Sequence, residues 1–268
     1  MNCYSIKPER ECGFCISLAL QLPYNRRVLI LALDTSSPTG SLAVLRDNTV
    51  LGVIGTSSEE NFSSRFFRQL QFLLGELNLA LDRFDLFSVV TGPGSFTGLR
   101  VGLAAAKGWA EVRHRPIAAI SALEAVASQA YTHARLVLPV LDARRGQFFF
   151  AAYKRSVSQE ELVLEGDECL ATPEEFGQAL RRLERFSGAV VATPSRESAS
   201  TLISQLNEQI GDTQPIAVEE VSPILAPSVG RLGFLRAKSG RLTDSLWLDA
   251  NYIRRSDAEL HLKAPIGP

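Results

Sequence analysis

Histidine and methionine are scarce in this chain of 268 residues, and long apolar runs are absent. No two of the three histidines, His114, His133 and His261, lie four positions apart, which excludes a helical pair of metal-binding histidines. No apolar run approaches the roughly 20 residues that a membrane-spanning helix needs. Lys and Arg number 28 against 29 for Asp and Glu, so the chain lacks the basic excess of a protein that grips nucleic acid by itself.

Signatures of catalysis are also missing. No Gly-Lys-Ser/Thr sequence follows a glycine loop, so no Walker phosphate loop is present. No Gly-x-Ser-x-Gly nucleophile elbow occurs either. The sequence therefore assembles no metal, base and nucleophile together, and we predict a chain without catalytic residues of its own.

Three of the four cysteines, Cys3, Cys12 and Cys15, lie in the first 27 residues. A lone Cys-x-x-Cys without a second pair is weak evidence for zinc. Because the first predicted strand begins abruptly at Val28, we expect residues 1–27 to be a loose, dispensable extension or a misassigned start. The one cysteine that remains gives no disulfide framework, which predicts a reducing, cytoplasmic compartment.

The first half of the chain alternates strands and helices. "RVLILALDTSS" (27–37) is a continuous apolar run typical of a buried strand, and two further strands follow at hairpin spacing. Residues 61–77 then switch to the helical period. The remaining segments are predicted as strand 84–92, helix 97–113, strand 116–121 and helix 121–131.

The second half repeats this order. Asp34 and Gly40 in "LILALDTSSPTGSLAVLRD" are echoed by Asp142 and Gly146 in "LVLPVLDARRGQFFFAAYK". Thr172 begins a helix with a capping box, and further helices are predicted at 195–209 and 226–239. We therefore expect an α/β protein with two lobes related by duplication. The predicted division is extension 1–27, N-terminal lobe 28–133, C-terminal lobe 134–256 and flexible tail 257–268.

A glycine-rich segment, "VVTGPGSFTGLRVGLAAAKGWA" (89–110), joins a strand to a helix. Backbone N–H groups at such a junction form a ready anion site. The favoured interpretation is a tight turn with Ser95 or Thr97 as helix N-cap, because neither the Walker spacing nor the Gly-x-Gly-x-x-Gly spacing of dinucleotide-binding loops fits. Asp34 has two open interpretations, a Mg-phosphate ligand or an Asx-turn. The candidate phosphate-binding residues are Asp34, Thr35, Ser36, Gly92, Gly94 and Ser95.

The helices at 61–77 and 97–113 are more apolar than one buried face requires, which is typical of an interface. Small residues in the second helix would let a partner helix come close. The predicted partner interface comprises Phe62, Phe66, Phe67, Leu70, Leu74, Gly98, Gly102, Ala106 and Trp109.

The segments "ILALDTSS", "VVTGPGSFTGLRVGLAAAKGWA", "ISALEAVA", "LDARRGQFFFAAY" and "NYIRR" resemble, in order and spacing, the bacterial TsaB (YeaZ) family, sometimes filed as glycoprotease-like. This resemblance covers roughly residues 28–256. It implies two duplicated lobes of the RNase H-like, actin-like (ASKHA) fold. It also implies a role in making N6-threonylcarbamoyladenosine at position 37 of tRNA.

The resemblance further implies which partners the chain has. It implies a non-catalytic subunit that supports a TsaD-type catalytic subunit, with a TsaE-type ATPase joining the complex and tRNA reached only through it. It implies no cofactor of the chain's own, with ATP and metal held by the partners, and a homodimer when the partner is absent. The alternative is an active ASKHA enzyme, either a small-molecule kinase or a metallopeptidase-like protein.

Overall fold

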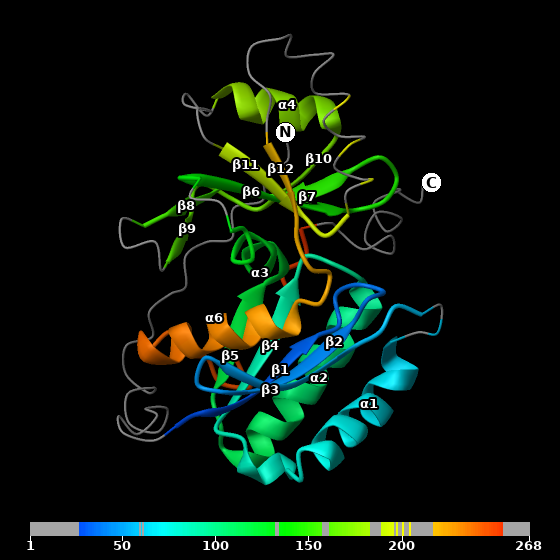
Figure 1. Cartoon of the computed structure of the whole chain (residues 1–268), viewed down its shortest axis with the longest axis vertical. Coiled ribbons are helices and arrows are strands. Elements are labelled where there is room, and N and C mark those ends of the chain that lie inside the picture. The colour runs from blue at the N-terminus through cyan, green and yellow to red at the C-terminus, as the bar shows by residue number, and fades with distance from the viewer. Residues whose placement is uncertain are drawn as a thin grey trace, which may run out of the picture.

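The computed structural model describes residues 27–253 except 59, 61, 132–133, 157–160, 183–188, 196, 198–199, 201–203 and 205–216. Within this range the chain forms two β-sheets, one in each of two lobes that are stacked along the long axis of the molecule (Figure 1). None of the helices in this range is both long and apolar enough to cross a membrane.

The first sheet is built around the apolar run that follows Arg27. Its central strand, β1, is buried along its whole length. β1 pairs antiparallel with β2 and parallel with β4, so the sheet is mixed with the order β3-β2-β1-β4-β5. These strands confirm the predicted ones. They are β1 (Leu29–Asp34), β2 (Ser41–Arg46), β3 (Thr49–Gly55), β4 (Leu86–Gly92) and β5 (Ile117–Ser121).

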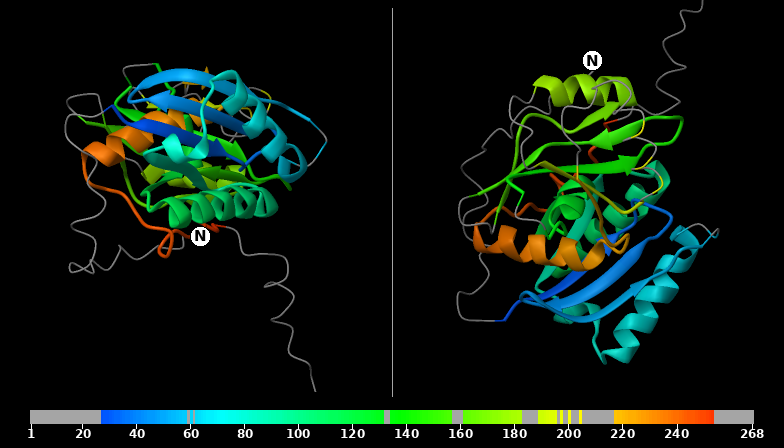
Figure 2. Two further views of the ribbon diagram at one scale, coloured as in Figure 1. Left: turned by 90° about the horizontal axis from the view of Figure 1, so that it is seen from below. Right: turned by 45° about the horizontal axis from the view of Figure 1, so that its top comes forward.

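Helices cover both faces of the first sheet (Figure 2). They are α1 (Phe62–Glu76), α2 (Phe96–Arg113) and α6 (Ala226–Lys238). Successive residues of a strand point to opposite faces. On β4, Phe87 packs against the α2 side chain Trp109, whereas the next hydroxyl, that of Ser88, donates to the Val229 carbonyl of α6. The Phe66 ring of α1 also stacks on Trp109, so α1 and α2 share one face and α6 lies on the other.

The second sheet repeats the topology of the first. Its central strand, β6, pairs antiparallel with β7 and parallel with β11, as β1 does with β2 and β4. Its order is β10-β7-β6-β11-β12, with the β8-β9 hairpin attached to β6. This repeat confirms two α/β lobes with mixed sheets. The strands are β6 (Leu136–Asp142), β7 (Phe148–Phe150), β8 (Tyr153–Arg155), β9 (Leu162–Leu164), β10 (Cys169–Ala171), β11 (Ala189–Thr193) and β12 (Ala217–Glu220).

The second lobe carries helix α4 (Pro173–Arg182), which begins with the predicted capping box. The Glu175 amide donates to the Thr172 hydroxyl, and the Thr172 amide donates to the Glu175 carboxylate. Helix α3 (Ala122–Ala127) is shorter than the helix predicted at 121–131, and β10 and β12 were not predicted. A short 3-10 helix spans Leu81–Arg83. The helix predicted at 195–209 falls mostly outside the described residues.

The end of the described chain returns to the first lobe. Helix α6 follows β12 but packs on β1, β2, β4 and β5. Its small residues allow this close approach, since a Cβ added at Gly233 would meet the side chain of Ser88. Thr243 then forms an isolated antiparallel bridge with Ile117, the first residue of β5. The predicted division at 133 and 134 stays a prediction, but α6, which it assigns to the second lobe, lies on the first sheet.

Candidate functional site

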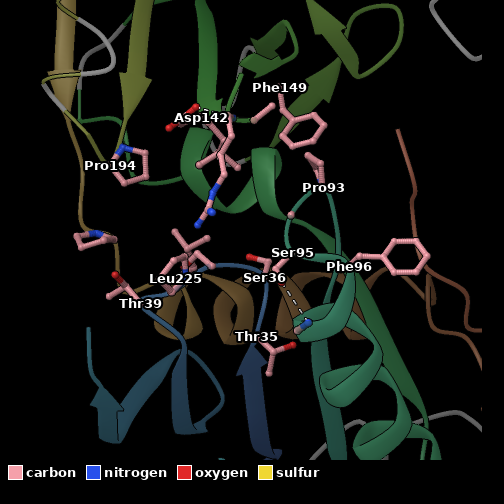
Figure 3. A pocket seen from close by; sticks show the side chains of 18 of the residues that line it. Thr35, Ser36, Thr39, Pro93, Ser95, Phe96, Asp142, Phe149, Pro194 and Leu225 are labelled. Carbon is pink, nitrogen blue, oxygen red and sulfur yellow. Dashed lines mark hydrogen bonds between the residues drawn. The ribbon is translucent and has the colours of Figure 1, made fainter. Parts of the chain in front are cut away.

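A cleft of about 1320 Å³ lies between the lobes, at the carboxyl ends of the central strands of both sheets. Equivalent turns of the two lobes face each other across it. From the first lobe come residues 35–39, after β1, and residues 93–98, at the start of α2. From the second come residues 141–145 and 193–195, and residues 251–253 also line the cleft. Figure 3 shows Asp142 and Phe149 on one wall and Thr35, Ser36 and Ser95 on the opposite wall.

Asp34 ends β1 and is fully buried. Its Oδ1 accepts from the Ser36 amide at 2.9 Å and from the Ser36 hydroxyl at 2.6 Å, which is the geometry of an Asx-turn. Asp142 holds its own turn in the same way, accepting from the Arg144 amide at 2.6 Å. The Asx-turn interpretation of Asp34 is therefore confirmed, whereas its Mg-phosphate role stays a prediction.

The second oxygen of Asp34, Oδ2, has no hydrogen-bond partner in the described part of the chain. Burial raises the pKa of this carboxyl from 3.8 to about 6, although the bonds from Ser36 lower it. Asp34 itself does not line the cleft, whereas Thr35 and Ser36 do. The hydroxyl turn thus separates this carboxylate from the cleft.

The glycine loop packs on this same turn. Ser95 is the N-cap of α2 and accepts from the Gly98 amide at 3.3 Å, as the dashed line in Figure 3 shows. The Ser95 amide donates to the Ser36 carbonyl at 2.7 Å. A Cβ added at Gly94 would meet Ser36. The prediction of a tight turn with Ser95 as the N-cap of the following helix is therefore confirmed.

The small-residue stripe of α2 also serves the chain's own packing. A Cβ added at Gly98 or Gly102 would overlap Thr35, and Ala106 is fully buried. We predicted that this stripe admits a partner helix; at Gly98 and Gly102 it instead admits the turn after β1. The reason is that α2 crosses directly over the end of β1, and only glycine leaves room for that turn.

Helix α1 divides its apolar residues between the core and the surface. Phe66, Leu70 and Leu74 of the predicted interface are buried within this chain and are not available to a partner. Phe67 and Phe72, by contrast, are 60% and 61% exposed. Trp109 is half-buried beneath Phe66, and the side chain of Phe62 lies outside the described residues. Among the side chains that the structure describes on these two helices, the large exposed apolar ones are therefore Phe67 and Phe72 on α1 and Val112 on α2.

Metal-ligating side chains are not gathered in this part of the molecule. Among the described residues, no three His, Cys, Asp or Glu side chains are grouped so that they could hold a metal ion. Cys169 is free and buried. His114 caps the end of α2 in the left-handed conformation, and His133 and His261 lie outside the described residues.

Sequence reasoning missed the segment that closes the cleft. Asn251 and Tyr252 line it, and the Asn251 carbonyl lies where a Cβ at Gly92 would be. Gly92, with φ of 132°, therefore has two reasons to be glycine. The sequence signal for this segment was the "NYIRR" motif. Its residue types do not indicate where in the fold the segment lies.

Comparison with known proteins extends these observations. The family model described as "TsaD: tRNA N6-adenosine threonylcarbamoyltransferase" matches residues 43–186, just over half of the chain. The "tRNA threonylcarbamoyladenosine biosynthesis protein TsaB" of Bacillus subtilis is 38% identical over 125 residues, which are 47% of this chain and 55% of that protein. The Escherichia coli protein of the same name is 31% identical over 158 residues, 58% of this chain and 67% of its own length. The match thus spans little more than half of the first of these relatives.

A solved structure of YeaZ from Pseudomonas aeruginosa has the same fold. It superposes with a TM-score of 0.67 at 24% identity and covers 84% of this chain and 99% of its own. The two lobes are therefore actin-like. The chain belongs to the protein family that the threonylcarbamoyltransferase model describes, and within it to the TsaB (YeaZ) proteins.

Proposed function

We propose that this chain is a non-catalytic subunit of the complex that makes N6-threonylcarbamoyladenosine at position 37 of tRNA, and that it supports a TsaD-type catalytic subunit. The kinship with TsaB proteins supports the pathway. In this proposal a TsaE-type ATPase joins the complex, the partners hold ATP and metal, and tRNA is reached only through them. The near-zero net charge agrees with a chain that does not bind tRNA alone.

One observation carries the non-catalytic assignment. The loop that would cradle a phosphate in an actin-like enzyme is occupied by this chain's own turn. The Ser95 amide at the start of α2 donates to the Ser36 carbonyl, and Gly94 and Gly98 are in contact with the same turn. One carboxylate oxygen of Asp34 accepts hydrogen bonds from the amide and the hydroxyl of Ser36. In this proposal, the groups that would position a reactive phosphate serve to maintain the fold.

The exposed face of α1 supports the partner role. Phe67 and Phe72 lie on one helix and are exposed to the same extent, yet they point about 140° apart, since five positions separate them. Phe67 lies against Phe66, whose ring stacks on Trp109 of α2. We place the partner surface there, on the exposed seam of α1 and α2, and the same surface pairs with a second copy when TsaD is absent.

The two phenylalanines provide a matched test of this surface. Tagged protein is used to capture the TsaD-type subunit of the same cell, and the affinity of the purified pair is measured. We expect Phe67→Glu to weaken binding at least tenfold, because it places a charge in an apolar contact. Phe72→Glu is expected to bind as the original chain does.

Both variants are expected to keep the melting temperature, since neither side chain is buried. Unchanged affinity in Phe67→Glu would place the interface elsewhere, and equal loss in both variants would show that it is not confined to the Phe67 side of α1. Failure of the original chain to bind any TsaD-type subunit would overturn the proposed function.

A further inference from the structure

The segment 249–253, here called the C-terminal strap, lies across the start of α2. The Asn251 amide donates to the Thr91 carbonyl at the end of β4, at 2.8 Å. The Tyr252 ring packs on Phe96 with centroids 4.4 Å apart, and its hydroxyl accepts from Arg100 at 3.3 Å. The strap is therefore fastened to the first lobe at two neighbouring places.

The same strap is also fastened to the second lobe. Asn251 Nδ2 donates to Glu168 Oε2 at 2.7 Å, and Glu168 directly precedes β10. The other carboxylate oxygen accepts from the hydroxyls of Tyr153, at 3.0 Å, and Ser121. Ser121 ends β5 and caps α3, so Glu168 binds the first lobe both directly and through the strap.

The surroundings of Glu168 make these donors necessary. Burial raises the pKa of the Glu168 carboxyl, whereas the donors Ser121, Tyr153 and Asn251 lower it. The nearby Glu124 raises it further and is itself paired with Arg236 at 2.6 Å. A carboxylate in this position is satisfied only while the strap and β5 stay in place.

We propose that the C-terminal strap is an interlobe fastening, with the Asn251–Glu168 bond as its lock, that holds the two lobes together across the glycine loop. Because Asn251 and Tyr252 line the cleft, releasing the lock detaches the strap from the second lobe and opens the cleft at the start of α2. This device explains the "NYI" part of the sequence motif without reference to the partner complex. It belongs to the isolated chain, so its test is independent of the proposed function.

A reciprocal exchange tests the lock. In Glu168→Gln, an amide N–H₂ faces the N–H₂ of Asn251, or the two hydroxyl donors lose their acceptor. In Asn251→Asp, two carboxylates face each other. In the double variant Glu168→Gln/Asn251→Asp the donor and acceptor are exchanged, so a hydrogen bond forms again with the same total charge.

Amide hydrogen exchange of the isolated full chain provides the measurement. In each single variant we expect the peptides that contain Asn251 and Gly92 to exchange at least tenfold faster, with α1 unchanged. In the double variant we expect rates within about threefold of the original. The proposal would be overturned if the double variant exchanged as fast as the faster of the two single variants. It would also be overturned if Glu168→Gln folded and exchanged at the original rate.

Two control variants separate the lock from a general effect on the second lobe. Lys154→Ala removes an exposed ion pair with Glu165, between two second-lobe residues, and is expected to leave the strap's exchange unchanged. Asp167→Asn changes the exposed neighbour of Glu168 and is expected to do the same. If Glu168→Gln does not fold, Asn251→Ala replaces it, and unchanged exchange at Gly92 in that variant contradicts the proposal.

Discussion

Among single residues, Asp34 shows most clearly what a sequence leaves undecided. A strand that ends in Asp-Thr-Ser predicts either a ligand or an Asx-turn, since both need an acceptor followed by hydroxyls. The choice depends on burial, which comes from α2 and the turn around it. In the fold, Ser36 donates to one oxygen, and packing encloses the other without a hydrogen-bond partner among the residues that the structure describes. No local pattern in the sequence predicts that second oxygen's surroundings.

The buried carboxylate predicts a pH-dependent stability. The pKa of Asp34 is higher in the folded chain, about 6, than its ordinary value of 3.8, so folding favours the protonated form. Its contribution to stability is therefore full below about pH 3.8 and is lost as the pH rises through 6. This difference corresponds to about 3 kcal/mol at pH 7.

We expect Asp34→Asn, which keeps the acceptor for Ser36 and cannot ionise, to unfold with a free energy up to about 3 kcal/mol higher than the original at pH 7. The advantage should shrink as the pH falls toward 4. Denaturant unfolding at several pH values measures this. Asp34→Ala, which loses the turn, serves as the control and should be less stable throughout; a pH-independent difference for Asp34→Asn would refute the assignment.

At the scale of elements, the period of α1 predicted both a core helix and an interface helix. The core helix is confirmed by the burial of its inner stripe, and the interface stays a prediction. Phe66 is fully buried and Phe67 is mostly exposed, although they are neighbours. The sequence predicts the helix and its apolar excess, but the buried stripe is chosen by the position of α2 and β3. The same holds for Gly98 and Gly102 of α2. The sequence shows that these positions are small, but it does not show that the turn after β1 packs against them.

Two glycines of α2 give a matched prediction. A Cβ at Gly102 would overlap the Thr35 hydroxyl, whereas a Cβ at Gly108 meets nothing within 4 Å. We expect Gly102→Ala to destabilise the fold by about 1–3 kcal/mol through overpacking. Gly108→Ala should stabilise it by roughly 1 kcal/mol, because alanine favours the helix.

Thermal or denaturant unfolding of both variants measures the difference. Equal effects at the two positions would show that the turn after β1 does not pack on α2 as described. A bulkier change at Gly102, such as Gly102→Arg, is then a test of folding and is unsuited to probing an interface.

For the whole molecule, the echo of Asp34 and Gly40 in Asp142 and Gly146 was sufficient to predict the duplication, because each pair marks the turn of the central hairpin. The edge strands of the second lobe escaped prediction. β10 has only three residues, too few to show a period, and two of the four residues of β12 are glutamates. The return of α6 to the first sheet is a long-range contact that no local pattern encodes.

The most direct test of the central claim is reconstitution of the tRNA modification. The purified chain, a TsaD-type subunit and a TsaE-type ATPase from the same cell are combined with tRNA, ATP and the threonylcarbamoyl donor, and the modified adenosine is quantified. Since the chain is proposed to act only by supporting its partner, we predict that it forms no product alone and that its omission lowers product formation at least tenfold. Turnover by the isolated chain that is lost in Asp34→Ala would contradict the account and assign the chemistry to this chain.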